Sequence, residues 1–360
     1  MRSLHMRMVI ELLVLVGLLW MGAGYAGAQD AGMPKTTGYD LKKPVVGAAC
    51  PTCPWGGMAI IVKEALKPYG WDVQICYYCA GGPREARLVS KAAMATPPEN
   101  PSPNDLPTPK GPIDFGVTGT EFLQWAYMGT NDFAKDPGTP QKQLRIIARI
   151  QEPTYYIIAV RADSGITNLS QIVEKKLPVK MIARTGIGGL TTPTVLEYYG
   201  ITDEKIKSFG GTFATGYNRD NEANVFLGFG SLTNAPEYAV WYQAIQKYDL
   251  KYLELAPDLK QKLMREFNYK EGTLPVGSFR GVDKPIPTLV RDGTVIYGRT
   301  DMPDEFAYTL AKAMDEHQEL LQWPNASMNW SYNWRTVWKA LDVPLHPGAA
   351  KYYKEVGYMK

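Results

Sequence analysis

Residues 44–77 read PVVGAACPTCPWGGMAIIVKEALKPYGWDVQICY, and this stretch decides the fold class. Val45–Ala49 is a short apolar run of the kind that forms a buried parallel strand, and Trp71–Tyr77 alternates as a second strand. Between the two runs, Gly56–Tyr69 carries apolar residues at helical spacing and is followed by Gly70. A strand, a helix and a strand of these lengths predict a parallel βαβ unit.

The same alternation continues through the middle of the chain. Apolar runs predict further strands at Ile113–Thr118, Gln143–Ile150, Tyr155–Arg161 and Val179–Ile182. Helical patterns are found at Arg84–Met94, Glu121–Met128, Asn168–Lys175 and Pro193–Tyr199. Strands that alternate with helices at this spacing predict doubly wound α/β lobes with parallel strands.

The composition is that of an ordinary globular chain. Of its 360 residues, 45% are apolar and 21% are charged, which excludes both a disordered chain and a coiled coil. The formal net charge is only +3, whereas binding to nucleic acid needs clustered Lys and Arg on a clearly basic domain. Nucleic acid is therefore excluded as a partner.

The N-terminus has the pattern of a secretory signal peptide over residues 1–28. Arg2 and Arg7 precede the apolar run Leu12–Met21, and the small residues 26–28 suit cleavage after Ala28. An uncleaved anchor is the alternative, but the run has about half of the ~20 residues that a membrane span needs. No later stretch is apolar enough to span a bilayer. We therefore expect a soluble mature chain in the periplasm, without direct membrane insertion.

The four cysteines, Cys50, Cys53, Cys76 and Cys79, are spaced C-x2-C-x22-C-x2-C. In an exported chain this spacing predicts two disulfides, whose pairing the sequence leaves open. A zinc site and a reactive thiol at a helix start are the alternatives. Because parallel strands end at the same edge of a sheet, we expect Cys50 and Cys76 to lie side by side. That edge is where ligands bind in open α/β sheets.

Two glycine-rich turns precede predicted helices. Residues 185–192, TGIGGLTT, lack the lysine of a phosphate-binding loop and do not fit G-x-G-x-x-G, so no nucleotide cofactor is expected. Such a turn still offers backbone amides and the positive end of a helix to a small anion, and Gly81-Gly82 repeats the arrangement. Residues 96–112 contain seven prolines, which predict a surface loop or a segment that docks a partner.

Nothing in the sequence indicates an enzyme. After the predicted signal peptide, His317 and His346 are the histidines that remain, and neither lies in a cluster with metal-ligand spacing. The motifs G-x-S-x-G and H-E-x-x-H do not occur. We therefore expect a binding protein without a metal or a cofactor.

The C-terminal run Leu345–Gly357, LHPGAAKYYKEVG, closely resembles the closing signature of the TAXI solute receptors. These receptors are the extracytoplasmic binding subunits of one class of TRAP transporters. Arg161–Ile166 resembles a second motif of this family, and the order of elements agrees over nearly the whole mature chain. The resemblance implies a two-lobed, type II-like periplasmic binding protein with doubly wound mixed sheets joined by a hinge.

The resemblance also implies how the chain is divided and what it does. Lobe I would contain residues 29–152, lobe II residues 153–284, and residues 285–360 would return to lobe I. The lobes would close on a small carboxylate-bearing solute and deliver it to the membrane subunits of a TRAP permease. An accessory or docking protein of another periplasmic assembly is the alternative, acting through the cysteine edge and residues 96–112.

Several ligand positions of the family pattern are changed in this chain. Pro83 and Ala86 stand where the family usually has serine and asparagine, and Thr233 stands where it has aspartate. Arg84 is the candidate cation, because a guanidinium binds a carboxylate bidentately. The candidate solute contacts are Trp55, Gly56, Gly57, Tyr77, Tyr78, Gly82 and Arg84 in the first lobe, and Thr191, Thr192 and Asn234 in the second.

Overall fold

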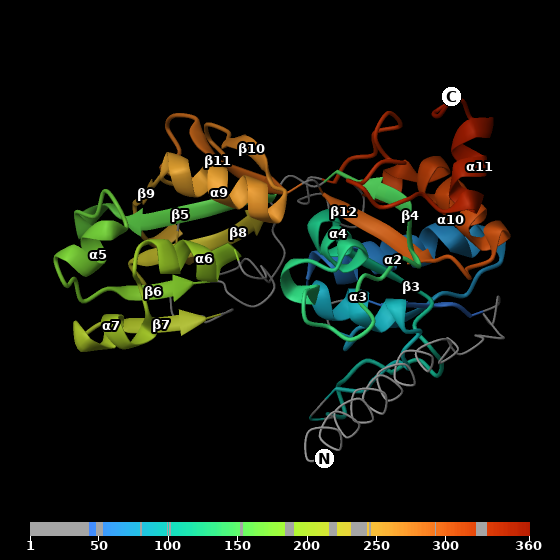
Figure 1. Cartoon of the computed structure of the whole chain (residues 1–360), viewed down its shortest axis with the longest axis horizontal. Coiled ribbons are helices and arrows are strands. Elements are labelled where there is room, and N and C mark those ends of the chain that lie inside the picture. Colours follow the sequence, from blue (N-terminus) through green and yellow to red (C-terminus); the bar gives the residue numbers. More distant parts are fainter. Residues whose placement is uncertain are drawn as a thin grey trace, which may run out of the picture. The chain divides into compact units, whose positions relative to one another are not determined.

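The computed structural model describes residues 43–47, 53–79, 81–98, 100, 102–151, 154–183, 191–215, 222–231, 243–244, 246–291, 293–321 and 330–360. The predicted signal peptide lies outside these residues. The described strands form two mixed sheets accompanied by helices, which confirms the α/β fold expected from the sequence (Figure 1). Among the described helices, none combines the length and the apolar composition that a membrane crossing requires.

The first sheet has the strand order β2-β1-β3-β12-β4. β1 (Val45–Gly47), β2 (Gln74–Cys76) and β3 (Phe115–Gly119) are parallel. β12 (Thr294–Arg299) runs antiparallel to β3 and to β4 (Leu144–Ile150), so the sheet is mixed rather than wholly parallel. The pairing of β1 with β2 across an intervening helix confirms the βαβ unit expected from residues 44–77.

A helix follows each parallel strand of the first sheet. α2 (Pro54–Leu66) follows β1, α3 (Pro83–Ser90) follows β2, and α4 (Thr120–Met128) follows β3. Because the three strands are parallel, their helices all begin at the carboxyl edge of the sheet. The chain returns to this sheet with β12, α10 (Asp304–Glu316) and α11 (Pro347–Glu355).

The second sheet has the strand order β10-β11-β5-β8-β6-β7, with β9 paired to β5. Its strands are β5 (Thr154–Arg161), β6 (Lys180–Ala183), β7 (Thr212–Thr215), β8 (Val225–Ser231), β9 (Leu250–Tyr252), β10 (Lys270–Leu274) and β11 (Ile286–Arg291). β6 is parallel to β7 and β8, and the other pairs are antiparallel. The associated helices are α5 (Ser170–Glu174), α6 (Thr191–Tyr198), α7 (Asp203–Ser208) and α9 (Pro257–Phe267).

The chain crosses between the two sheets twice, from β4 to β5 and from β11 to β12. At the second crossing, the Thr120 amide at the start of α4 donates to the Gly293 carbonyl oxygen at 3.1 Å. β11 extends the second sheet to Arg291, beyond Lys284, where the sequence analysis ended the second lobe. The start of α4 therefore lies against the segment that links the sheets.

The run that resembles the TAXI signature begins α11. His346 is the N-cap residue, and its Nδ1 accepts the Gly348 amide at 3.2 Å while its Nε2 lies 3.1 Å from the Met302 carbonyl oxygen. A Cβ at position 348 would lie 2.1 Å from the carbonyl oxygen of Asp304 at the start of α10. Glycine is therefore required where these two helix starts meet, and this part of the run serves packing.

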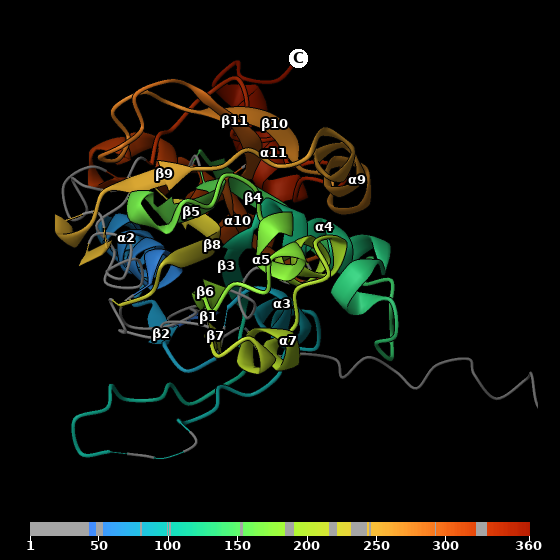
Figure 2. The same ribbon diagram turned by 90° about the vertical axis from the view of Figure 1, so that its left-hand side faces the viewer.

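The proline-rich residues described between Ala95 and Gly111 form no helix or strand, and they extend away from the sheet as a loop (Figure 2, teal). Tyr78, in the turn after β2, holds this loop at two points. Its hydroxyl donates to the Asp105 carboxylate at 3.2 Å and accepts the Leu106 amide at 3.0 Å. This is the surface loop that the prolines predict.

Candidate functional site

The carboxyl edge of the first sheet carries the starts of α2, α3 and α4. None of the three is capped by a side chain among the described residues, and each N-terminus carries the partial positive charge of its helix. Trp55, in the first turn of α2, is 7% exposed, and its ring centroid lies 6.1 Å from that of Phe122 on α4. This edge therefore combines polar backbone groups with aromatic surface.

A buried ion pair joins this edge to the second sheet. Nε of Arg291, the last residue of β11, lies 2.7 Å from Oε1 of Glu121, in the first turn of α4. Their side chains are 9% and 2% exposed. Because charges are expensive to bury, each side chain compensates for the water that the other has lost.

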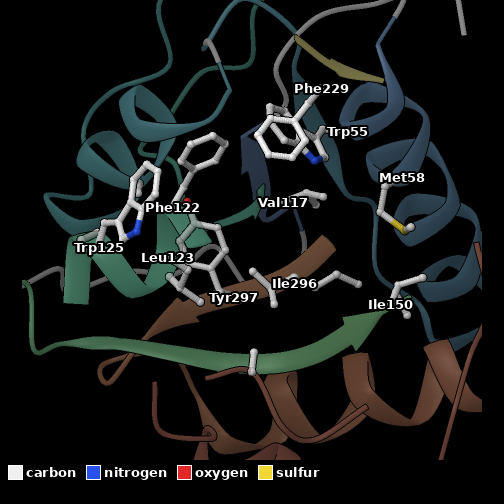
Figure 3. Close-up of a cluster of buried hydrophobic side chains, with 14 of the residues drawn as sticks. Trp55, Met58, Val117, Phe122, Leu123, Trp125, Ile150, Phe229, Ile296 and Tyr297 are labelled. Atoms are coloured by element: carbon white, nitrogen blue, oxygen red, sulfur yellow. The ribbon is translucent and has the colours of Figure 1, made fainter. Parts of the chain in front are cut away.

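Aromatic rings from both sheets enclose the Arg291 guanidinium. Its central carbon lies 4.0 Å from the ring centroid of Phe229 on β8 and 5.2 Å from that of Phe122. Figure 3 shows Phe122 and Phe229 with Trp55 and Trp125 over the apolar core of the first sheet. We call Arg291, Glu121, Phe122, Phe229 and Tyr269 the Arg291 enclosure. Attraction between a cation and aromatic faces helps to hold the guanidinium in place.

Tyr269, the residue before β10, completes the enclosure from the second sheet. Burial raises the pKa of Tyr269, while the neighbouring Arg291 guanidinium acts in the opposite direction. Its hydroxyl lies 2.6 Å from the Thr191 hydroxyl at the start of α6. The Tyr156 hydroxyl donates to Thr192 at 3.3 Å. The side chains of both predicted threonines are therefore buried and bonded within the second lobe.

Further contacts join α4 to the elements around α9. The side-chain amide of Asn268 donates to Oε1 of Gln124 at 2.8 Å. The ring centroids of Trp125 and Phe267 lie 5.6 Å apart. The ion pair therefore belongs to a continuous contact between the first sheet's α4 and the second sheet.

The other predicted solute residues lie in different surroundings. Arg84, in the first turn of α3, is exposed, and Gly82 precedes that helix with a φ of 63°, in the region that favours glycine. Gly56 and Gly57 lie in the first turn of α2, while Tyr77 is half-buried. The Tyr78 hydroxyl is engaged by the proline-rich loop, as described above. Asn234 lies outside the described residues.

Cys76 and Cys79 form a disulfide, with their Cα atoms 5.5 Å apart, and Cys53 is also disulfide-bonded. Cys50 lies outside the described residues. In the register of the parallel pair, Gly47 is the residue opposite Cys76. Of the pairings that the sequence left open, Cys76 pairs with Cys79, and cysteines bonded in this way do not supply the four thiolates of a zinc site. The expected proximity of Cys50 to Cys76 involves a residue outside the described ones. Among the described residues, no group of three or more His, Cys, Asp or Glu side chains is placed to hold a metal.

A second buried carboxyl lies under α3. Oε1 of Glu85 accepts the Val117 amide at 2.7 Å and the Tyr297 hydroxyl at 3.2 Å, and the side chain has no exposed surface. A Cβ at Gly116 would lie 2.5 Å from the same oxygen. Burial raises the pKa of Glu85 well above its ordinary value of 4.5, although the two hydrogen bonds oppose that shift. The Glu85 carboxyl therefore keeps its proton at pH values above those at which an exposed glutamate loses it.

The sequence analysis missed the Arg291 enclosure. Its signals are charged residues next to apolar strands: Glu121 comes two residues after β3, and Arg291 ends the run Ile286–Val290. Each signal alone is common at the end of a strand. The crossing from β11 to β12 is what brings Arg291 next to Glu121.

The family model of NMT1-like proteins matches residues 104–357, well over half of the chain. The chain belongs to the NMT1-like family. The match includes Glu121, Arg291 and the start of α11, and it begins after the cysteines, within the proline-rich loop.

This NMT1-like chain is also similar to several solved structures. XAC2383 from Xanthomonas citri, bound to ATP, is 12% identical, with 88% of this chain and 95% of that chain covered and a TM-score of 0.40. MatC from Rhodopseudomonas palustris, with bound malate, is 10% identical, with 78% and 86% covered and a TM-score of 0.42. Rpa4515 from R. palustris, with adipate, is 9% identical, with 77% and 83% covered and a TM-score of 0.39. At TM-scores below 0.5, these likenesses say nothing of what this chain binds.

Proposed function

We propose that this NMT1-like protein is an exported solute receptor that binds a small carboxylate-bearing solute between two lobes. It passes the solute, chemically unchanged, to a TRAP-type permease in the membrane. Lobe I begins with residues 29–152 and lobe II contains residues 153–291, because β11 belongs to the second sheet, and the chain returns to lobe I with β12. The TAXI-like runs at Arg161–Ile166 and Leu345–Gly357 support the link to a TRAP permease.

The observation that carries this proposal is the position of Arg291. A guanidinium is a strong ligand for a carboxylate, and burial increases the strength of that attraction. Arg291 ends β11, next to the crossing between the sheets, and it contacts residues of both. A solute held here would touch both lobes, which is the condition for closing on it.

The edge of the first sheet supplies the remaining contacts of the proposed site. Gly56 and Gly82 are the proposed backbone contacts at helix starts, and Trp55 and Tyr77 offer aromatic surface. Gly57 is proposed as a point of close approach only, because its amide donates to the Cys53 carbonyl oxygen at 3.1 Å. Arg84 gives an exposed positive charge at the same edge. In the second lobe, Thr191, Thr192 and Asn234 are the proposed contacts, with the threonines acting through their backbone because their hydroxyls are engaged within the lobe.

The experiment that tests the proposal is a thermal-shift screen of the purified mature chain with small aliphatic and aromatic acids. A solute that binds only the folded state stabilises it by about 2.7 kcal/mol at a hundredfold excess over its Kd. We expect at least one carboxylate to raise the Tm and to be recovered unaltered after incubation. A screen in which no solute raises the Tm, or recovery of a converted product, contradicts the proposal.

A docking role is the second candidate function, and it rests on Tyr78. This side chain attaches the proline-rich loop to the turn that contains the Cys76–Cys79 disulfide, so the loop and the turn form one presented surface. A permease gene beside the gene for this chain favours transport, whereas a neighbouring gene for an oxidoreductase or a sensor favours docking.

A further inference from the structure

We propose that Glu121 is an internal occupant of the anion site on Arg291, and that the carboxylate of the solute replaces it. Glu121 then acts as a specificity-determining residue, because only a ligand that supplies its own negative charge can take its place. This inference rests on the proposed function and names the group of the solute that enters the Arg291 enclosure.

The Arg291 enclosure always needs an anion. Arg291 is 9% exposed and stays charged at any physiological pH, so a negative partner must compensate for the water that it has lost. In this structure Glu121 provides that partner at 2.7 Å. A carboxylate from solution offers the same two oxygens and can meet the guanidinium bidentately.

Arg291 stays in place when its partner changes. Its guanidinium lies over the rings of Phe229 on β8 and Phe122 on α4, at 4.0 and 5.2 Å. These contacts do not depend on Glu121. A guanidinium also has five N–H donors, more than a single carboxylate takes up.

Glu121 has a second stabilising neighbour besides Arg291, the start of α4. Its two carboxylate oxygens lie 2.8 and 2.9 Å from the position that a Cβ would occupy on Gly119, the N-cap residue of α4. A negative charge in the first turn is stabilised by the helix dipole and by the amides of that turn. Gly119 therefore makes the space in which the Glu121 carboxylate lies beside the positive helix end, and that helix end still stabilises the carboxylate when Arg291 takes another partner.

The exchange predicts that removing the charge of Glu121 improves binding of carboxylates and of no other class. In Glu121→Gln the shape is kept while the competing charge is lost. We expect this variant to bind a carboxylate about tenfold more tightly than the wild type does, since close charge pairs at binding sites are worth at least that factor. Without ligand, the variant melts at a lower temperature because Arg291 has lost the charge that faces it.

The test is a calorimetric titration of the wild type, Glu121→Gln and Arg291→Lys with acetate, pyruvate, succinate and benzoate. The corresponding neutral amides, such as acetamide and benzamide, are titrated in parallel. Arg291→Lys keeps the charge but loses the planar fork, and we expect it to bind carboxylates about tenfold more weakly than the wild type. Asp249→Asn is the matched control, because it removes the carboxylate of an exposed pair with Arg280, and its affinity should equal that of the wild type.

Three outcomes overturn the inference, and they differ in what they say of the proposed function. Equal carboxylate affinity in wild type and Glu121→Gln shows that the ion pair is structural only, while the receptor function stands. Tight binding of a neutral or cationic solute in place of the carboxylates also leaves a receptor but removes the exchange. If no solute binds to the wild type or to either variant, both the inference and the proposed function fail.

Discussion

Glu85 and Glu121 occupy the same kind of position in the first lobe, yet their partners differ. Each lies in the first turn of a helix that follows a parallel strand, and each side chain is at most 2% exposed. Glu85 faces the Val117 amide and the Tyr297 hydroxyl, whereas Glu121 faces the guanidinium of Arg291. Burial without a cation keeps a proton on Glu85, so the neighbour rather than the helix start decides what a buried carboxyl does.

This difference in partners indicates a structural role for Glu85 and a binding role for Glu121. Glu85 ties α3 to β3 and β12, all within the first sheet and its helices. Glu121 is bonded to the last residue of a strand in the second sheet. Variants of the two residues and of their partners should therefore change different properties.

The largest effect on stability is expected from Arg291→Met, which leaves Glu121 buried opposite an apolar side chain. Breaking a buried ion pair from one side costs about 3–5 kcal/mol. The measurement is the free energy of unfolding from urea denaturation. In the double variant Arg291→Met/Glu121→Gln no charge is left behind, so most of the loss should be recovered. A double variant as unstable as Arg291→Met would mean that Arg291 stabilises the fold through its aromatic contacts rather than through its charge.

Gly116→Ala should have the next largest effect, because it acts on the surroundings of Glu85. The new methyl group would lie 2.5 Å from Oε1 of Glu85 and 2.7 Å from the Tyr297 hydroxyl oxygen, both buried. Overpacking of this kind costs about 1–3 kcal/mol, measured again by urea denaturation. Carboxylate affinity should not change, since Glu85 is not part of the Arg291 enclosure. Wild-type stability in this variant would show that the Glu85 pocket is looser than the contacts indicate.

Glu85→Gln sharpens the comparison through the pH dependence of stability. Because the pKa of Glu85 is raised on folding, the folded chain binds its proton more tightly than the unfolded chain does above pH 4.5. The stability from this group is complete below that pH and is lost as the pH rises toward the folded pKa. Glutamine resembles the protonated acid, so the variant should gain stability relative to the wild type between pH 5 and pH 8.

The control for that measurement is Glu64→Gln, on the exposed face of α2, which should follow the wild-type profile. Unfolding free energies at several pH values give the difference between each variant and the wild type. A constant difference between Glu85→Gln and the wild type would mean that Glu85 is ionised in the folded protein, and the contrast with Glu121 would disappear.

The parts of the fold that the sequence predicted are those with local signals. Met58, Ile61 and Val62 lie one helical turn apart, and all three are buried on α2, so the βαβ unit followed from spacing alone. The place of β12 between β3 and β4 depends on pairing between strands far apart in the chain, and no local pattern reports it. The Cys76–Cys79 bridge is local, within the turn after β2, but the C-x2-C spacing alone left its pairing open.

The candidate site shows the same limit more sharply. Arg84 was chosen because it follows a glycine pair at a helix start, which is a local feature, and it proves to be exposed. Arg291 becomes a candidate only when the crossing between β11 and β12 brings it to Glu121. The environment that makes a cation valuable, aromatic faces from two sheets and little water, is a product of tertiary structure.

The smallest effect is expected from Arg84→Ala, which tests whether the exposed cation adds anything to the buried one. Arg84 lies at the positive end of α3, so its loss should change the free energy of unfolding by no more than about 0.5 kcal/mol. An exposed charge contributes about 0.2–1 kcal/mol to an ion pair, so carboxylate affinity should fall by about 1.4- to fivefold in calorimetric titration. Unchanged affinity removes Arg84 from the proposed site. We expect the loss to be smaller than that of Arg291→Lys, because solvent screening weakens an exposed charge far more than one enclosed by aromatic rings. An equally large loss would instead make Arg84 the main anion ligand.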